Sequence, residues 1–359
     1  MEKMKAGIIG CGNISAIYLE NLAKSSEVEI VACADIRLDR AKERAAEFGI
    51  ASAYTPEQLL ADEQIELVIN LTVPSSHAAV DIAALEAGKH VYAEKPLATS
   101  LLDAKRVQEL AGLKELRIGS APDTFLGSGI QTAKAAIDAG LIGQPIAGTA
   151  FMMGEGPEGW HPDPEFFYTP GGGPMLDMGP YYLTALVELL GPVRRISAST
   201  GAQMPSRTIG SGPKSGTQIP VQTPTHLAGT IDFAKGAIVT MITSFDIKGG
   251  ANLPWIEIYG TAGTLSLPDP NFFNGDVQLR RSGSEQWEVL TPMFECSQNE
   301  RGLGVNDMVE SIRAHKLHRA NGQLAYHVLE AMYAFEKSSL AGSHIELESR
   351  ADMNMSNGK

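Results

Sequence analysis

Short apolar runs alternate with longer helical patterns along the first third of the chain. Five of these runs predict β-strands: Ala6–Ile9, Glu29–Ala34, Leu67–Leu71, His90–Ala93 and Arg117–Gly119. Between them, segments such as Leu38–Phe48 and Ala78–Ala87 carry apolar residues at three- and four-residue spacing, which is typical of amphipathic helices. This alternation over residues 4–121 predicts an α/β fold with a doubly wound parallel sheet covered by crossover helices.

The pattern changes after Pro122. A helical segment near Ile130–Ala139 is followed by alternating apolar and polar runs, such as Ala237–Ser244 and Trp255–Tyr259, which predict strands of a sheet with one solvated face. A long helical pattern over Val305–Ser339, interrupted near residues 320–322, precedes a polar end. We therefore expect a first domain over residues 1–121, a second α/β domain over 122–345, and a polar tail over 346–359.

One segment inside the second domain has no periodicity. Gly201–Thr225 is rich in Gly, Ser, Thr and Pro, which predicts a long excursion between strands. Two interpretations stay open for it, because such an excursion either lines a cleft or joins subunits.

Composition supports two domains and excludes several classes of protein. A chain of 359 residues exceeds what one hydrophobic core usually organises, and no apolar run approaches the roughly 20 residues that span a bilayer. A net charge of −13 repels polyphosphate backbones, so nucleic acid is not an expected partner. The N-terminus lacks the pattern of a secretory signal, and the three cysteines, Cys11, Cys33 and Cys296, form neither a disulfide framework nor a zinc pattern. We expect a cytoplasmic protein that has no membrane segment and no metal site.

The first predicted strand runs into a glycine turn at Gly10-Cys11-Gly12-Asn13-Ile14. Two glycines permit a tight turn and a close approach of the backbone to a pyrophosphate at a helix N-terminus. The third glycine of the dinucleotide fingerprint is absent, although Ser15 and Ala16 are small enough for close packing of a helix. An ordinary strand-to-helix turn is the alternative interpretation of this motif.

An acidic residue follows the second strand at a position that suits a dinucleotide. Asp35 lies 25 positions after Gly10, where a carboxylate accepts hydrogen bonds from the adenosine ribose, and this favours NAD. Arg37, two residues later, suits a 2′-phosphate, so NADP also stays open. A lysine, Lys95, leaves the strand at Val91–Pro96 on the carboxyl edge of the sheet, where open α/β sheets bind ligands.

Three landmarks together resemble a known family. Glu94-Lys95-Pro96 stands at a characteristic distance from the glycine turn, Leu71–His77 precedes it, and Gly171–Tyr181 contains a glycine triplet followed by a helix start. These segments resemble the glucose-fructose oxidoreductase, inositol dehydrogenase and rhizopine-catabolism (Gfo/Idh/MocA) oxidoreductases. The resemblance implies a Rossmann domain followed by an α/β domain with an open, mostly antiparallel sheet. It also implies a coenzyme site that includes Thr72, Pro74, His77, Glu94 and Lys95.

By the same resemblance, Lys95 and Asp177 are catalytic. The usual histidine of the family falls on Tyr181, four residues after Asp177 and so on the same helical face, with Pro180 tolerated in the first turn. Tyrosine is a much weaker base than histidine, with a reference pKa near 10 against about 6.5, and a neighbouring lysine cation favours its phenolate. The proton acceptor is therefore Tyr181 assisted by Lys95, or alternatively His161.

His161 belongs to a Pro-rich aromatic loop over Glu158–Tyr168. Rings such as Trp160 and Tyr168 suit stacking on the C–H face of a sugar, and packing beneath the loop is the other interpretation.

The resemblance implies hydride transfer between nicotinamide and a carbinol carbon of a sugar, glycoside or cyclic polyol. Two alternatives remain: an NAD-dependent glycoside hydrolase that acts through transient oxidation, and a non-catalytic NAD-binding regulator. A homo-oligomer, dimer or tetramer, is expected by resemblance.

Overall fold

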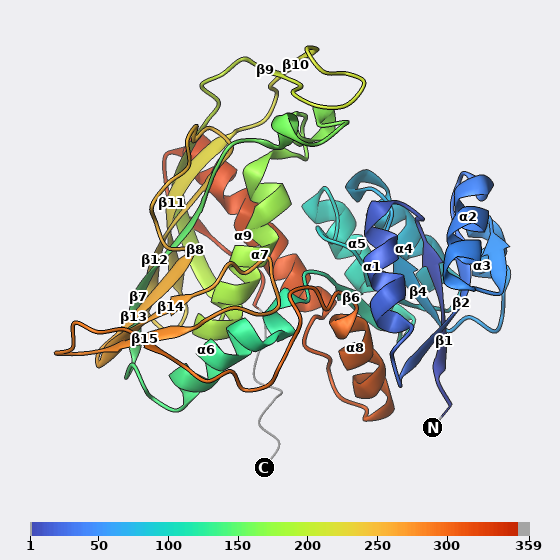
Figure 1. The fold of residues 1–359 in the computed structure, drawn as a ribbon, viewed down its shortest axis with the longest axis horizontal. Helices are drawn as coiled ribbons and strands as arrows, with labels where there is room; N and C mark the ends of the chain where they lie inside the picture. Colours follow the sequence, from blue (N-terminus) through green and yellow to red (C-terminus); the bar gives the residue numbers. More distant parts are fainter. Residues whose placement is uncertain (1, 351–359) are drawn as a thin grey trace. The chain divides into compact units, whose positions relative to one another are not determined.

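The computed structural model describes residues 2–350 and divides them into two compact units (Figure 1). The first unit contains the chain up to Leu126 and a later segment, Asn299–Tyr326. The second contains Gly127–Gln298 and, within the described residues, the chain from His327 to Arg350. The second unit is thus largely an insertion within the first.

The first unit contains a six-stranded parallel sheet with the strand order β3-β2-β1-β4-β5-β6. This order is that of a Rossmann fold, and it confirms the predicted doubly wound sheet. The strands are β1 (Met4–Ile9), β2 (Val28–Ala34), β3 (Ser52–Tyr54), β4 (Leu67–Asn70), β5 (His90–Ala93) and β6 (Ile118–Ser120).

Crossover helices connect these strands, as parallel pairing requires. They are α1 (Asn13–Leu22), α2 (Leu38–Phe48), α3 (Pro56–Ala61), α4 (His77–Glu86) and α5 (Leu101–Leu113), with 3₁₀ turns η1 (Pro74–Ser76) and η2 (Thr124–Leu126). Local sequence sets several ends: α3 begins with a reciprocal capping box between Thr55 and Gln58, and α2 ends at Gly49, whose φ is +68°.

The segment Asn299–Tyr326 completes the first unit with helix α8 (Leu303–Arg313). Buried Asp123 caps this helix, because its Oδ2 accepts hydrogen bonds from the backbone N–H groups of Gly302 and Gly304, both at 2.9 Å. Asn21 on α1 donates to the carbonyl of Asn299 at 3.1 Å. The first unit therefore needs residues from both ends of its discontinuous sequence.

The second unit contains a nine-stranded sheet with the order β16-β15-β14-β13-β7-β12-β11-β8-β17. Strands β7 and β12 pair in parallel and the other neighbours are antiparallel, which confirms the predicted, mostly antiparallel sheet. The strands are β7 (Pro145–Met153), β8 (Val193–Gly201), β11 (His226–Phe233), β12 (Ile238–Ser244), β13 (Ile256–Gly260), β14 (Gly263–Leu267), β15 (Gln278–Arg281), β16 (Glu288–Val289) and β17 (Ile345–Glu346).

Three helices pack against one face of this sheet (Figure 1). They are α6 (Ser128–Asp138), α7 (Gly173–Leu190) and α9 (Gly322–Ala341), and the 3₁₀ turns η3 (Pro157–Gly159) and η4 (Glu165–Tyr168) precede α7. One expectation was wrong: Pro180 does not lie in the first turn of its helix. The helix begins earlier, at Gly173 with Pro174 in its first turn, so Pro180 lies in the helix interior.

The end of the described chain is attached to the second unit. Strand β17 pairs with β8, and the Leu347 N–H donates to the Arg194 carbonyl at 2.9 Å. Of the predicted polar tail 346–359, positions 351–359 lie outside the described residues. Within residues 2–350, each helix is too short or too polar to cross a membrane.

Candidate functional site

The glycine turn after β1 has the shape that a dinucleotide requires. Gly10 has φ +104°, and a Cβ placed on it would lie 2.6 Å from the backbone carbon and oxygen of Leu71. Gly12 is the N-cap of α1, and a Cβ there would meet no atom within 4 Å. Gly10 is thus required by the turn itself, whereas Gly12 leaves space in front of the helix N-terminus, where anions are stabilised. Asn13 and Ile14 form the first turn of that helix.

Asp35 joins this turn to the end of β2. Its carboxylate accepts hydrogen bonds from the backbone N–H groups of Cys11 at 2.9 Å and Arg37 at 2.8 Å. Arg37 is the exposed N-cap of α2. Arg44, within α2, donates to the carbonyl of Gly12 at 3.3 Å. Arg44 was not among the predicted residues. It lies six positions after the start of α2, and no known motif marks that position.

A buried polar cluster supports the loop after β4. The Asn70 amide donates to Asp81 at 2.7 Å and to the His77 carbonyl at 3.1 Å, and its oxygen accepts from the Thr72 hydroxyl at 2.7 Å. The two ring nitrogens of His77 face the carbonyls of Pro96, at 2.7 Å, and Thr72, at 3.0 Å. His77 is fully buried, so it links the two loops and has no surface to offer a ligand. Burial lowers its pKa.

Glu94 and Lys95 follow β5 on the same edge of the sheet. Glu94 is buried, accepts from the Tyr18 hydroxyl of α1 at 2.8 Å, and accepts from the Lys95 N–H at 3.0 Å. Burial, followed by the Glu94 carboxylate, raises the pKa of Tyr18, so that its hydroxyl remains a donor. The backbone at Lys95 is therefore held on one side by Glu94 and on the other by the contact of the Pro96 carbonyl with His77.

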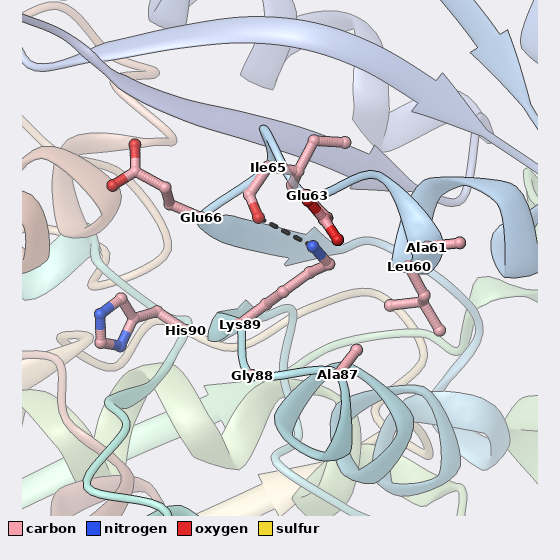
Figure 2. A pocket seen from close by; sticks show the side chains of 9 residues that line it. All are labelled: Leu60, Ala61, Glu63, Ile65, Glu66, Ala87, Gly88, Lys89 and His90. Carbon is pink, nitrogen blue, oxygen red and sulfur yellow. Dashed lines mark hydrogen bonds between the residues drawn. The ribbon is translucent and has the colours of Figure 1, made fainter.

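Figure 2 shows a different pocket in the first unit, of about 520 Å³, lined by Leu60, Ala61, Glu63, Ile65, Glu66, Ala87, Gly88, Lys89 and His90. It lies at the amino ends of β4 and β5, on the sheet edge opposite Lys95. Its lysine, Lys89, is buried and donates to the carbonyls of Asp62 at 2.7 Å and Ile65 at 2.8 Å. Because this cation already binds structural carbonyls, the pocket is not our candidate coenzyme site.

In the second unit, the glycine triplet places helix α7. A Cβ on Gly172 would lie 2.4 Å from the Phe166 carbonyl, and Gly173 has φ +89°, so these positions admit no larger residue without movement of the chain. Asp177 and Tyr181 follow within α7, one turn apart as predicted. Asp177 is partly exposed and Tyr181 is buried.

The loop before the triplet contains His161 among aromatic rings. The imidazole has edge contacts with the rings of Trp160 and Phe166, each at 5.5 Å, and of Phe167 at 5.4 Å. Its Nδ1 accepts a hydrogen bond from the Asp163 N–H at 3.1 Å. A neutral imidazole in that arrangement carries its proton on Nε2, so His161 presents a donor at Nε2.

Exposure distinguishes the aromatic side chains of this loop. Trp160 is 70% exposed and Phe166 is 48% exposed, whereas Tyr168 is fully buried. The Tyr168 hydroxyl donates to Glu158, and burial raises its pKa. Trp160 and Phe166 therefore present ring surface to solvent, and Tyr168 packs beneath the loop.

Comparison with known families assigns both units. The family model described as “Oxidoreductase family, NAD-binding Rossmann fold” matches residues 4–120, and the model described as “GFO/IDH/MocA C-terminal domain” matches residues 130–266. The chain belongs to the Gfo/Idh/MocA family.

Several curated Gfo/Idh/MocA relatives are similar in sequence. Myo-inositol 2-dehydrogenase of Thermotoga maritima is 31% identical over 40% of this chain and 43% of its own length. Inositol 2-dehydrogenase of Salmonella typhimurium is 38% identical over 40% and 44%, respectively. The chain thus matches less than half the length of these two relatives. 1,5-Anhydro-D-fructose reductase of Ensifer adhaerens is 26% identical over 95% of this chain and 98% of its own.

Solved structures agree with the family fold. An NAD binding oxidoreductase from Klebsiella pneumoniae has a TM-score of 0.81 at 23% identity, over 96% of this chain and 99% of its own. A levoglucosan dehydrogenase in complex with NADH and levoglucosan has a TM-score of 0.82 at 20% identity, over 97% and 100%. At these identities the likeness establishes the fold.

The structure thus gathers the predicted residues into two groups. The carboxyl edge of the Rossmann sheet brings together the glycine turn, Asp35, the loop from Thr72 through Pro74 to His77, and Glu94-Lys95. The second unit holds Asp177 and Tyr181 on α7, and Trp160, His161 and Tyr168 in the preceding loop. The polar supports Tyr18, Arg44, Asn70 and Asp81 were not predicted. The partners of Tyr18 and Arg44 lie 76 and 32 positions away in sequence.

Proposed function

We propose that this Gfo/Idh/MocA protein is an NAD-dependent dehydrogenase that transfers a hydride between nicotinamide and a carbinol carbon of a sugar, glycoside or cyclic polyol. The carrying observation is the anchoring of Lys95 on the same sheet edge as the glycine turn, by Glu94 on one side and the Pro96 carbonyl on the other. A regulator that only binds NAD has no need of a lysine whose backbone is fixed at this edge. The relatives are named as inositol dehydrogenases and an anhydrofructose reductase, and these names support the substrate class.

The residues at the glycine turn fit a dinucleotide. The open space at Gly12 and the N-terminus of α1 would hold the pyrophosphate, and Asp35 would accept from the ribose hydroxyls with its remaining lone pairs. A carboxylate repels a 2′-phosphate, which supports NAD over NADP, although exposed Arg37 lies two residues away. NAD, when bound, supplies the hydride acceptor.

Within the protein, Lys95 would orient and polarise the reacting hydroxyl, and Tyr181 would accept its proton. Asp177, one helical turn before Tyr181, would position the substrate. His161 suits donation rather than proton abstraction, because its Nδ1 already accepts from the Asp163 N–H and its neutral ring carries the proton on Nε2.

The test is reduction of NAD, followed at 340 nm, with a panel of inositols, glycosides, anhydrosugars and free aldoses. We expect Lys95→Ala and Tyr181→Phe each to lower kcat by about 10²-fold or more, the usual range for a group that transfers a proton. His161→Gln should act mainly on the carbohydrate KM. Binding of NADH, titrated by its fluorescence, should stay within about twofold in Tyr181→Phe and His161→Gln.

Other outcomes have a definite meaning. Unchanged turnover and pH profile in Tyr181→Phe would exclude it as the proton acceptor. Cleavage of a glycoside without net NADH would favour the redox-neutral hydrolase. Tight NADH binding without turnover of any carbohydrate would favour a regulator.

We also propose a homo-oligomer that works in the cytoplasm. On the sheet face away from the helices, partly exposed Phe151 of β7 is paired with partly exposed Ile242 of β12, which offers apolar surface to a second copy. The three cysteines form no disulfide, which suits a reducing compartment. Light scattering coupled to size exclusion measures the oligomer directly, and a monomeric mass would refute this part.

A further inference from the structure

The excursion over Gly201–Thr225 has a defined structure in the second unit. It forms a small antiparallel hairpin from β9 (Ser206–Thr208) and β10 (Gln218–Pro220), separate from the large sheet. The hairpin packs through Ile209 and Ile219 against Phe167, Tyr168 and Phe245 in one buried apolar cluster. The segment that lacked periodicity thus contacts the aromatic loop directly.

Hydrogen bonds continue this contact along the loop. The Gly210 N–H donates to the Glu158 carbonyl at 2.7 Å, and the Ser211 hydroxyl donates to the His161 carbonyl at 3.2 Å. At the surface, Lys214 pairs with Asp163 at 2.8 Å and with Glu165 at 2.7 Å. The backbone on both sides of Trp160 is therefore tied to the hairpin.

Arg207 is the centre of this arrangement. The side chain is buried, with the residue 3% exposed, and its guanidinium donates to Glu158 at 3.1 Å, to the Phe245 carbonyl at 3.2 Å and to Asp246. It also lies over the Tyr168 ring, 5.5 Å from the centroid. Glu158 begins the aromatic loop, whereas Phe245 and Asp246 follow β12, so one cation joins the loop to the end of an inner strand of the large sheet.

The two carboxylates give Arg207 a role that another residue type fills poorly. A planar guanidinium binds two carboxylates and a carbonyl in fixed directions, whereas a lysine ammonium is a point charge on a flexible stem. Asp246 also accepts from the Thr225 hydroxyl at 2.9 Å, and Glu158 accepts from Tyr168 and from Lys248 at 3.3 Å. The orientation of Glu158, and of the loop that begins with it, therefore depends on the geometry of the Arg207 guanidinium.

We infer that Arg207 is the positioning residue of the carbohydrate-binding loop. It holds Glu158, and through the hairpin the His161 carbonyl, so that the exposed Trp160 ring and the His161 donor are presented in one orientation. This inference rests on the proposed function, because it assigns the loop to the substrate. Arg207 is buried in the second unit and touches neither of the predicted reacting groups in the described contacts. It should thus act on substrate affinity and leave coenzyme affinity unchanged.

The experiment compares two variants with the wild type. Arg207→Lys keeps the charge. A triple variant with Arg207→Met, Glu158→Gln and Asp246→Asn removes all three charges, so that no buried charge is left unpaired if the single change unfolds the protein. Arg195→Lys is the matched control, since Arg195 pairs with Asp232 at 2.6 Å on β8 and β11 of the same unit. For Arg207→Lys and the triple variant we expect a carbohydrate KM at least tenfold higher, with kcat changed less than threefold and the NAD KM less than twofold. The control should match the wild type.

Hydrogen exchange, measured by mass spectrometry on the full chain, separates positioning from general stability. Amides in residues 156–168 and 207–220 should exchange faster in Arg207→Lys, while those of the large sheet stay unchanged. Faster exchange throughout the unit, or local loosening with an unchanged carbohydrate KM, would overturn the inference. If the wild-type protein turns over no carbohydrate, the proposed function fails, whereas the exchange data still show whether Arg207 holds the loop.

Discussion

Asp81 offers the sharpest test of the first unit, because its carboxyl group is fully buried and half satisfied. Oδ1 accepts from the Asn70 amide at 2.7 Å, and Oδ2 has no hydrogen-bond partner among the described residues. Burial raises the pKa of Asp81 to about 8. The structure therefore favours the protonated acid, and Asp81→Asn replaces it by a neutral group of similar shape whose oxygen still accepts from Asn70.

The sign and size follow from proton linkage. The folded protein binds this proton more tightly than the unfolded chain, in which an aspartic acid has a pKa near 3.9, so stability from this group is complete below about pH 4 and is lost as pH rises to about 8. One unit of pKa corresponds to about 1.4 kcal/mol. Between pH 5 and pH 9, the wild-type protein should therefore lose about 4 kcal/mol relative to Asp81→Asn from this group alone.

The assay is urea denaturation of both proteins at several pH values, followed by circular dichroism. Taking the difference between variant and wild type at each pH removes the titration of all other groups. The matched control is Asp39→Asn, an exposed carboxylate at the start of α2, for which the difference should vary little with pH. A difference for Asp81→Asn that stays constant within about 0.5 kcal/mol from pH 5 to pH 9 would refute the reasoning, because the buried group would then be ionised at no cost.

Two further predictions concern the first unit. Gly10→Ala should destabilise the fold by about 2 kcal/mol, because its Cβ would meet the Leu71 backbone at positive φ. Gly12→Ala should leave stability unchanged and lower the affinity for NADH at least tenfold. Denaturation measures the stability of both variants, and fluorescence titration measures their affinity for NADH. Equal effects of the two changes on stability would contradict this division. Asp123→Ala should cost about 2 kcal/mol at pH 7 by leaving the N–H groups at the start of α8 unpaired, and Asp123→Asn should recover part of that loss in the same denaturation assay.

The sequence predicted those parts of the fold that depend on local patterns. Buried parallel strands appear as continuous apolar runs, so β4 and β5 were found within one residue of their ends. Strand β3 was missed, because its three residues, Ser52–Tyr54, are only half-buried and form no apolar run. The alternation with helices predicted a doubly wound parallel sheet, whereas the order of its strands came from the structure.

The site was predictable only where a motif stands close in sequence. The glycine turn and Asp35 are read along one β-α-β segment, and their contacts agree with that geometry. Arg207 has no such signal, since its carboxylate partners lie 49 and 39 positions away, in two different loops. The excursion that contains Arg207 lacks periodicity because its short hairpin packs against the aromatic loop and does not join the large sheet.

The insertion of the second unit has a consequence for how the protein is made. The capping of Asp123 onto α8 and the contact of Asn21 with Asn299 join residues nearly 180 and 280 positions apart. During synthesis, an N-terminal domain usually folds before the rest of the chain is complete. Here we expect the Rossmann unit to complete its packing only after the ribosome has released the segment ending at Tyr326, because α8 belongs to that segment. A protein shortened to residues 1–126 would lack α8 and its contacts with Asp123 and Asn21, so we expect the coenzyme-binding unit not to be separable by a single cut.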